Sequence, residues 1–123
     1  MGDLSAHFSK SEFTCPCGCG KVVVSPDLIE LLENVREFAG LPIQITSGYR
    51  CASHNAAVGG VPSSAHLTGE ASDFFVSGNI DRFKFLEAFF LYGGLRLGIG
   101  ATFLHVDVSH DLPSEVVWLY GKE

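Results

Sequence analysis

The sequence is short of positive charge. It holds 8 Lys and Arg residues against 14 Asp and Glu residues, which gives a formal net charge of −6, and the basic residues are scattered along the chain. Because a phosphate backbone is bound by clustered Lys and Arg side chains, this scarcity argues against a nucleic-acid partner. The lack of a cationic cluster also argues against a patch that binds anionic membranes.

The sequence also lacks the segments that take a chain into or across a membrane. Its apolar runs are far shorter than the about 20 residues that a spanning helix needs. The first residues, MGDLSA, contain no basic stretch followed by an apolar one, so we predict no signal peptide. We therefore expect synthesis in the cytoplasm, and release by another route if the protein acts outside the cell.

Repeats, linkers and low-complexity stretches are missing as well. The chain has 123 residues, of which 46% are apolar, and this is enough to build one sizeable hydrophobic core. We expect a single domain over residues 1–123 and a monomer.

What is present is a regular alternation of helix and strand signals. Capping residues and apolar spacing predict a helical turn at 9–12, helices over 26–39, 51–58 and from a cap at Asn79 or Asp81 to Tyr92, and strands over 22–24, 43–46, 71–76, 95–99, 103–108 and 116–119. The two strands at 95–99 and 103–108 should form a hairpin. This order predicts an α+β domain whose small, mostly antiparallel sheet is flanked by helices.

Two histidines and one aspartate stand out against this background. Asp73 lies inside an apolar strand, where a carboxylate is costly unless it is paired or binds a metal. His105 lies in another apolar strand, and His66 follows a polar loop. Two imidazoles and a carboxylate can hold catalytic zinc and leave its fourth position for water. The pattern predicts a zinc site at the sheet; the alternatives are an ion-paired Asp73 and a hydrogen-bonded core histidine.

Asp107 follows His105 by two residues, so both side chains face the same side of their strand. Two roles are open for this carboxylate. It could be the catalytic general base that takes a proton from water, or it could accept a hydrogen bond that orients a histidine ligand. The residues alone do not choose between them.

Arg50 ends a predicted strand beside Gly48. Its planar guanidinium suits a substrate carboxylate or a developing oxyanion, which predicts a substrate-binding and catalytic role. Ser64 could hydrogen-bond to substrate or to a ligand carboxylate. The alternatives are a surface ion pair for the arginine and simple solvation for the serine.

The cysteines are clustered. Cys15, Cys17 and Cys19 lie in a turn over residues 15–20, and the fourth is Cys51. In a cytosolic chain such clustering favours metal binding or free thiols over disulfides. The C-x-C-x-C spacing is tighter than the usual C-x2-C zinc clip. Three readings stay open: a structural zinc ion with Cys51 as the fourth ligand, a disulfide to Cys51, or a turn with unpaired thiols.

Several motifs together are similar to one family. The segment SAHLTGEASD at 64–73 resembles the SxHxxGxAxD signature of the D-Ala-D-Ala carboxypeptidase-type zinc peptidases, which cut peptidoglycan stem peptides and include some phage endolysins. SGYR at 47–50 resembles a further family element, and NAAVGG at 55–60 resembles the stretch that follows it. HVD at 105–107 resembles the ending of a subgroup of murein endopeptidases. The joint match covers about residues 8–108 and is specific.

This resemblance implies a hedgehog-like, D-Ala-D-Ala-peptidase-like fold. It makes Arg50 the residue that binds the substrate carboxylate or oxyanion and Ser64 a pocket residue, and it makes the zinc ligands His66, Asp73 and His105. Many members carry an acidic general base three residues before the last histidine ligand. Here that position is Thr102, which leaves Asp107 as the nearest candidate base.

We therefore expect a zinc metallopeptidase that hydrolyses an amide bond in peptidoglycan stem or cross-link peptides, as a carboxypeptidase or an endopeptidase. Such an enzyme would lyse or remodel cell walls, and the expected lack of a signal peptide fits a phage lysin or a phage-particle component. One alternative is a catalytically inactive, zinc-stabilised module that binds cell-wall peptides. Another is a small structural domain whose cysteines hold its metal.

Overall fold

The computed structural model of this protein describes residues 2–94 and 96–120. Its elements, in chain order, are a 3-10 turn η1 (Lys10–Glu12), helix α1 (Pro26–Ala39), strand β1 (Ile45–Ser47), helix α2 (Ala52–Ala57), a second 3-10 turn η2 (Ala65–Thr68), strand β2 (Ala71–Phe75), helix α3 (Gly78–Tyr92), and strands β3 (Arg96–Ile99), β4 (Phe103–Asp107) and β5 (Val116–Leu119).

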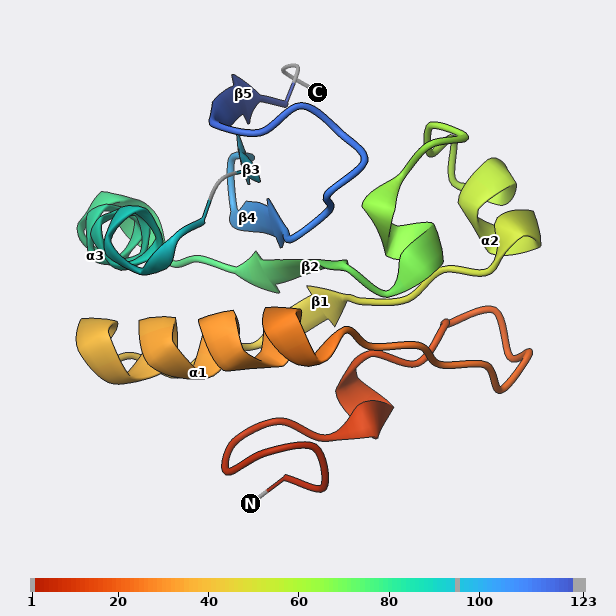
Figure 1. The fold of residues 1–123 in the computed structure, drawn as a ribbon, viewed down its shortest axis with the longest axis horizontal. Coiled ribbons are helices and arrows are strands. Elements are labelled where there is room, and N and C mark those ends of the chain that lie inside the picture. Colours follow the sequence, from red (N-terminus) through yellow and green to blue (C-terminus); the bar gives the residue numbers. More distant parts are fainter. Residues whose placement is uncertain (1, 95, 121–123) are drawn as a thin grey trace.

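The strands form one five-stranded sheet in the order β1-β2-β4-β3-β5. The pairs β1–β2, β2–β4 and β3–β4 are antiparallel, and β5 joins β3 in parallel. In Figure 1, α3 lies at the left of the sheet and α2 at the right, with the strands between them. The predicted α+β class with a mostly antiparallel sheet, and the predicted hairpin of β3 and β4, are confirmed.

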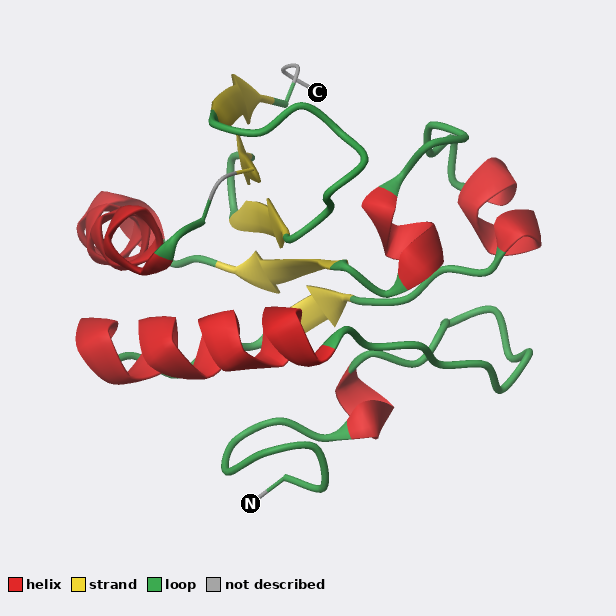
Figure 2. Cartoon of the chain, in the orientation of Figure 1, coloured by secondary structure: helices red, strands yellow, loops and turns green. Residues whose placement is uncertain are grey.

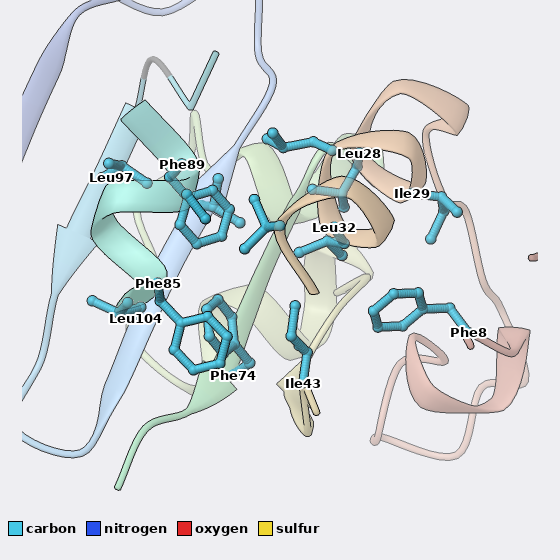
Figure 3. Packing of buried hydrophobic residues seen from close by; sticks show 14 of the residues in the cluster. Phe8, Leu28, Ile29, Leu32, Ile43, Phe74, Phe85, Phe89, Leu97 and Leu104 are labelled. Atoms are coloured by element: carbon cyan, nitrogen blue, oxygen red, sulfur yellow. The ribbon is translucent and has the colours of Figure 1, made fainter. Parts of the chain in front are cut away.

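The two faces of the sheet have different chemistry. On β2, Phe74 points to one face and is fully buried, while Asp73 and Phe75 point to the other. The first face packs against α1 and α3 and forms the apolar core, in which Phe74 contacts Phe85 and Phe89 at ring-centroid distances of 5.0 and 5.9 Å. Figure 3 shows this cluster between the helices and the strands. The second face is therefore free to carry polar groups.

The helix α1 begins and ends as the sequence predicts. Ser25 is the N-cap, Pro26 occupies the first turn, and Gly40 ends the helix in the left-handed region with φ 69°. The residues that α1 buries repeat at helical spacing: Leu28, Ile29, Leu31, Leu32 and Val35. Phe38, near the end of the helix, continues this apolar spacing but is 45% exposed.

The N-terminal segment packs under α1. Ser9 and Glu12 form the predicted capping box of η1, and Phe8 and Phe13 are buried in the core with their rings 6.1 Å apart. A long loop, green in Figure 2, joins η1 to α1. None of the helices in the described residues is long and apolar enough to cross a bilayer.

Three local predictions are wrong. Residues 22–24 form no strand, and the chain is instead held just after them by a single backbone hydrogen bond from Ser25 N to Gly69 O at 2.8 Å. The N-cap of α3 is Ser77, not Asn79 or Asp81. The first strand begins at Ile45, two residues later than predicted. Leu95, the first residue of the predicted strand 95–99, lies outside the described residues.

Candidate metal and active site

The pairing of β2 with β4 creates the centre of the site. Asp73 lies directly opposite His105 across the two strands, on the face that α1 and α3 leave free. The turn η2 brings His66 to the same place from the loop before β2. Each of the three side chains offers one ligand atom, and these atoms all lie within 4.8 Å of one another. Residues that are 39 positions apart in the sequence (66 to 105) thus converge on one point.

His66 is oriented by the backbone. Its Nδ1 lies 2.6 Å from the carbonyl oxygen of Gly48, and since a carbonyl only accepts, Nδ1 carries the hydrogen. The other ring nitrogen, Nε2, then presents a lone pair to Oδ1 of Asp73 at 3.5 Å. The imidazole is 2% exposed, so bulk water has little access to the space between these two acceptor atoms. Two acceptors that face each other in a buried site call for a cation between them.

His105 lies between two carboxylates. Its Nδ1 is 2.8 Å from Asp73 Oδ1, and its Nε2 is 2.8 Å from Asp107 Oδ2. Burial lowers the pKa of His105, but the hydrogen bonds to Asp107 and Asp73 outweigh it and the pKa is raised. Burial likewise raises the pKa of Asp73, yet the hydrogen bond from His105 outweighs it and holds this pKa well below its usual range. The carboxylate of Asp73 is therefore ionised and attracts a cation, as the donor set of a zinc site requires.

Asp107 has both oxygens occupied. Its side chain is 1% exposed, and while Oδ2 accepts from His105, Oδ1 accepts from Arg96 Nε at 2.7 Å and from the backbone of Ser109 at 3.2 Å. The guanidinium of Arg96 in turn stacks over Trp118, 5.1 Å from the ring centroid. Of the two roles left open by the sequence, these contacts favour the one in which Asp107 orients a ligand.

Arg96 was missed by the sequence analysis. In the hairpin register Arg96 is the direct cross-strand partner of Asp107. An arginine and an aspartate opposite each other in a predicted hairpin would indicate an ion pair. This inference needs the pairing register of the hairpin, which is set by the turn between β3 and β4.

Arg50 and Ser64 contact each other at the edge of the site. Arg50 Nη2 donates to Ser64 Oγ at 3.2 Å, and the same hydroxyl accepts from the backbone N–H of His66 at 3.2 Å. The Nε of Arg50 is buried without a hydrogen-bond partner among the described residues. The Nε–H of Arg50 is therefore available to donate to a ligand.

These groups line one cavity of about 480 Å³. It contains every predicted catalytic, substrate-binding and metal-binding residue outside the cysteine cluster, together with an aromatic wall that the sequence analysis missed: Phe103, Trp118 and Tyr120. Burial raises the pKa of Tyr120, so its hydroxyl stays protonated. Trp118 of β5 and Tyr120, the residue after this strand, both reach the cavity, and this alternation was visible only once β5 was known to pair with β3.

Thr102 and the cysteines lie elsewhere. Thr102 is exposed in the turn before β4, and its carbonyl accepts from Val76 N at 2.9 Å. The carboxylates that line the cavity in the described residues are Asp73 and Asp107. The four cysteines form a separate group between the loop after η1 and the start of α2, and none of them lines this cavity.

The family model described as Peptidase M15 matches residues 6–107, a span that includes all of the cavity residues named as metal, substrate or catalytic candidates. No curated protein sequence matches the chain. The family match confirms the resemblance to the D-Ala-D-Ala carboxypeptidase-type zinc peptidases. Because the match covers most of the chain, the protein belongs to the Peptidase M15 family of metallopeptidases.

Proposed function

We propose that this protein is a zinc-dependent peptidase that hydrolyses an amide bond in peptidoglycan stem or cross-link peptides. The observation that carries the proposal is the convergence of His66, Asp73 and His105 on one point of a cavity that Arg50 also lines. Membership of the Peptidase M15 family supports the same reaction class.

In this proposal the metal ligands are His66 Nε2, Asp73 Oδ1 and His105 Nδ1, because these atoms face one another. Zinc bound there would supply Lewis acidity toward a substrate carbonyl and lower the pKa of water from about 15.7 to about 7. The protein fixes both ligand imidazoles through their second nitrogens. The Gly48 carbonyl accepts from one, and the Asp107 carboxylate accepts from the other.

Arg50 is proposed to bind the substrate. Its guanidinium lines the cavity and has an Nε–H without a partner in residues 2–94 and 96–120, so it can form a two-point contact with a peptide carboxylate or with a developing oxyanion. Ser64 holds the guanidinium by accepting from its Nη2. Trp118 and Tyr120 form an apolar wall on which the rest of a short peptide can pack.

The cavity size is consistent with this substrate class. A volume of about 480 Å³ falls in the range of about 300–1,000 Å³ that small-ligand sites occupy, which is room for a short peptide rather than for a folded protein. We also propose that the fold is of the hedgehog-like type, that the protein works as a monomer without nucleic-acid or membrane partners, and that it acts on the cell wall after release, as a phage lysin would.

The test is to incubate zinc-loaded protein with purified peptidoglycan and to identify the released muropeptides by mass spectrometry. We expect new amines and carboxylates from one stem-peptide bond, loss of the activity with a chelator, and recovery with zinc. A His66→Ala, His105→Ala double variant should release nothing. Equal release with and without the chelator would exclude the zinc mechanism. If the parent binds muropeptides but cleaves none of them, the inactive binding module is the correct reading.

A further inference from the structure

The four cysteines form a second cluster of potential metal ligands, outside the cavity. The Sγ atoms of Cys15, Cys17 and Cys51 are 3.4, 3.5 and 3.7 Å apart in their three pairings, and the Sγ of Cys19 lies within 4.8 Å of the others. Cys15 is buried, Cys51 is partly buried, and Cys17 and Cys19 are exposed. The cluster therefore lies at the surface of the protein, with one of its four cysteines buried.

These distances suit a tetrahedral metal site. With a zinc–sulfur bond of about 2.3 Å, the sulfur atoms of a tetrahedral site with four cysteine ligands lie about 3.8 Å apart. The observed separations of 3.4 to 3.7 Å are close to this edge length. A disulfide bond of about 2.05 Å would join one pair of sulfurs, and it would not explain why the other two sulfurs lie close to that pair.

The backbone around the four cysteines favours a thiolate at Cys15 and brings the sulfur atoms together. The N–H of Cys51 points at the sulfur of Cys15 at 3.4 Å. A backbone N–H that donates to a sulfur favours the thiolate over the thiol. The thiolate is the form that binds metal. Gly18 and Gly20 have φ values of +90° and +77°, which let the chain fold back so that alternate cysteines face the same point.

We propose that Cys15, Cys17, Cys19 and Cys51 bind a structural zinc ion that is separate from the catalytic centre. This choice among the three readings of the sequence rests on the convergence of all four sulfurs. It does not depend on the proposed peptidase activity.

An ion bound by the four cysteines would also hold the segment that carries Arg50. Cys51 directly follows Arg50, and the loop that carries the other three cysteines is held to the same segment by a hydrogen bond from Tyr49 N to Phe13 O at 2.8 Å. The ion would therefore join the loop between η1 and α1 to the start of α2, next to the proposed substrate-binding arginine. This consequence rests on the proposed peptidase activity: the Cys17→Ser, Cys51→Ser double variant should hold Arg50 less firmly and show a KM that rises more than its kcat falls.

The first test is a zinc count on purified protein by mass spectrometry. We expect two zinc ions per chain in the parent. The His66→Ala, His105→Ala double variant should keep one ion, and the Cys17→Ser, Cys51→Ser double variant should also keep one. His54→Ala changes a histidine of α2 three residues after Cys51; it is the matched control and should keep two. A double histidine variant without zinc would overturn the proposal and would leave the peptidase hypothesis untouched.

The second test does not depend on whether a cysteine variant folds. Cobalt loaded into the double histidine variant should give the intense near-ultraviolet absorption of thiolate-to-cobalt charge transfer. Denatured, non-reduced parent treated with a chelator should present four free thiols to a thiol reagent. Two free thiols and a cross-linked Cys51 peptide would identify a disulfide, and an absorption spectrum of octahedral cobalt would identify adventitious binding. Either result would overturn the proposal.

Discussion

At the scale of single residues, the two proposed histidine ligands are held by different partners. His66 is oriented by a neutral carbonyl, whereas His105 is oriented by a buried carboxylate that is itself paired with Arg96. A carboxylate acceptor makes an imidazole a stronger ligand than a carbonyl acceptor does, because it favours positive charge on the ring. The Arg96–Asp107–His105 chain is therefore the part of the site where a single substitution is most informative.

We predict that Asp107→Asn weakens zinc binding to the catalytic site by about 10- to 100-fold. The amide removes the negative charge that His105 contacts and leaves Arg96 without its buried counter-ion. The measurement is competition with a chromophoric chelator, on the Cys17→Ser, Cys51→Ser background so that a single ion is titrated. Asp111→Asn, an exposed aspartate of the following loop, is the control and should bind as the parent does. Unchanged zinc affinity with lost turnover would instead assign Asp107 as the proton shuttle.

Gly48 carries a second prediction at this scale. A Cβ atom on this residue would lie 2.6 Å from the Cα of Phe13, so the backbone of one segment would have to move. Because the Gly48 carbonyl orients His66, we expect Gly48→Ala to destabilise the fold by about 3 kcal/mol and also to weaken zinc binding.

The control is Gly40→Ala at the end of α1. This glycine has φ +69° and open space around it, so alanine there adds only left-handed strain of about 1 kcal/mol. It should leave zinc affinity unchanged. Chemical denaturation and the same chelator competition measure both effects. Equal zinc affinities in the two variants would mean that the Gly48 carbonyl does not position His66.

Residue identities at the site were largely readable from the sequence. His66, Asp73 and His105 stand out because polar groups in apolar strands are costly, and the structure brings them together. Arg96, Trp118 and Tyr120 were not predicted, because nothing in their local sequence is unusual. Their place in the cavity depends on which strands pair and in which register, and that information is not local.

At the scale of elements, the sheet has the apolar core on one face and the proposed active site on the other. Neighbouring residues of β2 face opposite sides, and Phe74 is fully buried whereas Phe75 is 46% exposed. We predict that Phe74→Ala costs about 3–5 kcal/mol of unfolding free energy because it empties the aromatic cluster with Phe85 and Phe89. Phe75→Ala should cost less than about 1 kcal/mol. Similar losses from the two variants would contradict the register of β2, and denaturant unfolding measures them.

The elements themselves were predictable to different degrees. The caps and periodicity of α1 gave its limits, because both signals are local. Residues 22–24 resemble a strand in composition, yet Val23 is 49% exposed and no neighbouring strand in the described part of the chain is available to pair with it. The helix α3 is apolar around much of its circumference, so the sequence could not show that Phe83 and Phe90 would be 68% and 62% exposed. Burial there is decided by where α1 and the sheet lie.

At the scale of the whole molecule, the N-terminal segment and α1 are joined through one carboxylate. Glu33 accepts from the Ser5 hydroxyl, from the backbone of His7 at 2.7 Å and from the His7 ring at 2.7 Å. Burial raises the pKa of Glu33, but these hydrogen bonds outweigh it and hold the pKa below the ordinary 4.5. The segment before η1 is therefore attached to the body of the protein by the ionised form of this residue.

The sign of the pH dependence follows from that shift. Since the folded protein holds the Glu33 proton less tightly than the unfolded chain does, the contribution is fully present above pH 4.5 and is lost as the pH falls through the lowered folded pKa. We expect Glu33→Gln to cost about 1 kcal/mol at neutral pH, a small figure because His7 is 45% exposed and solvent screens the pair. The difference between parent and variant should shrink below pH 4.5. Denaturant unfolding across this range measures it, with Glu30→Gln on the exposed side of α1 as a control that should show almost no difference. A Glu33→Gln penalty that persisted unchanged into the acid range would mean that packing, and not the charge of the carboxylate, attaches the N-terminal segment.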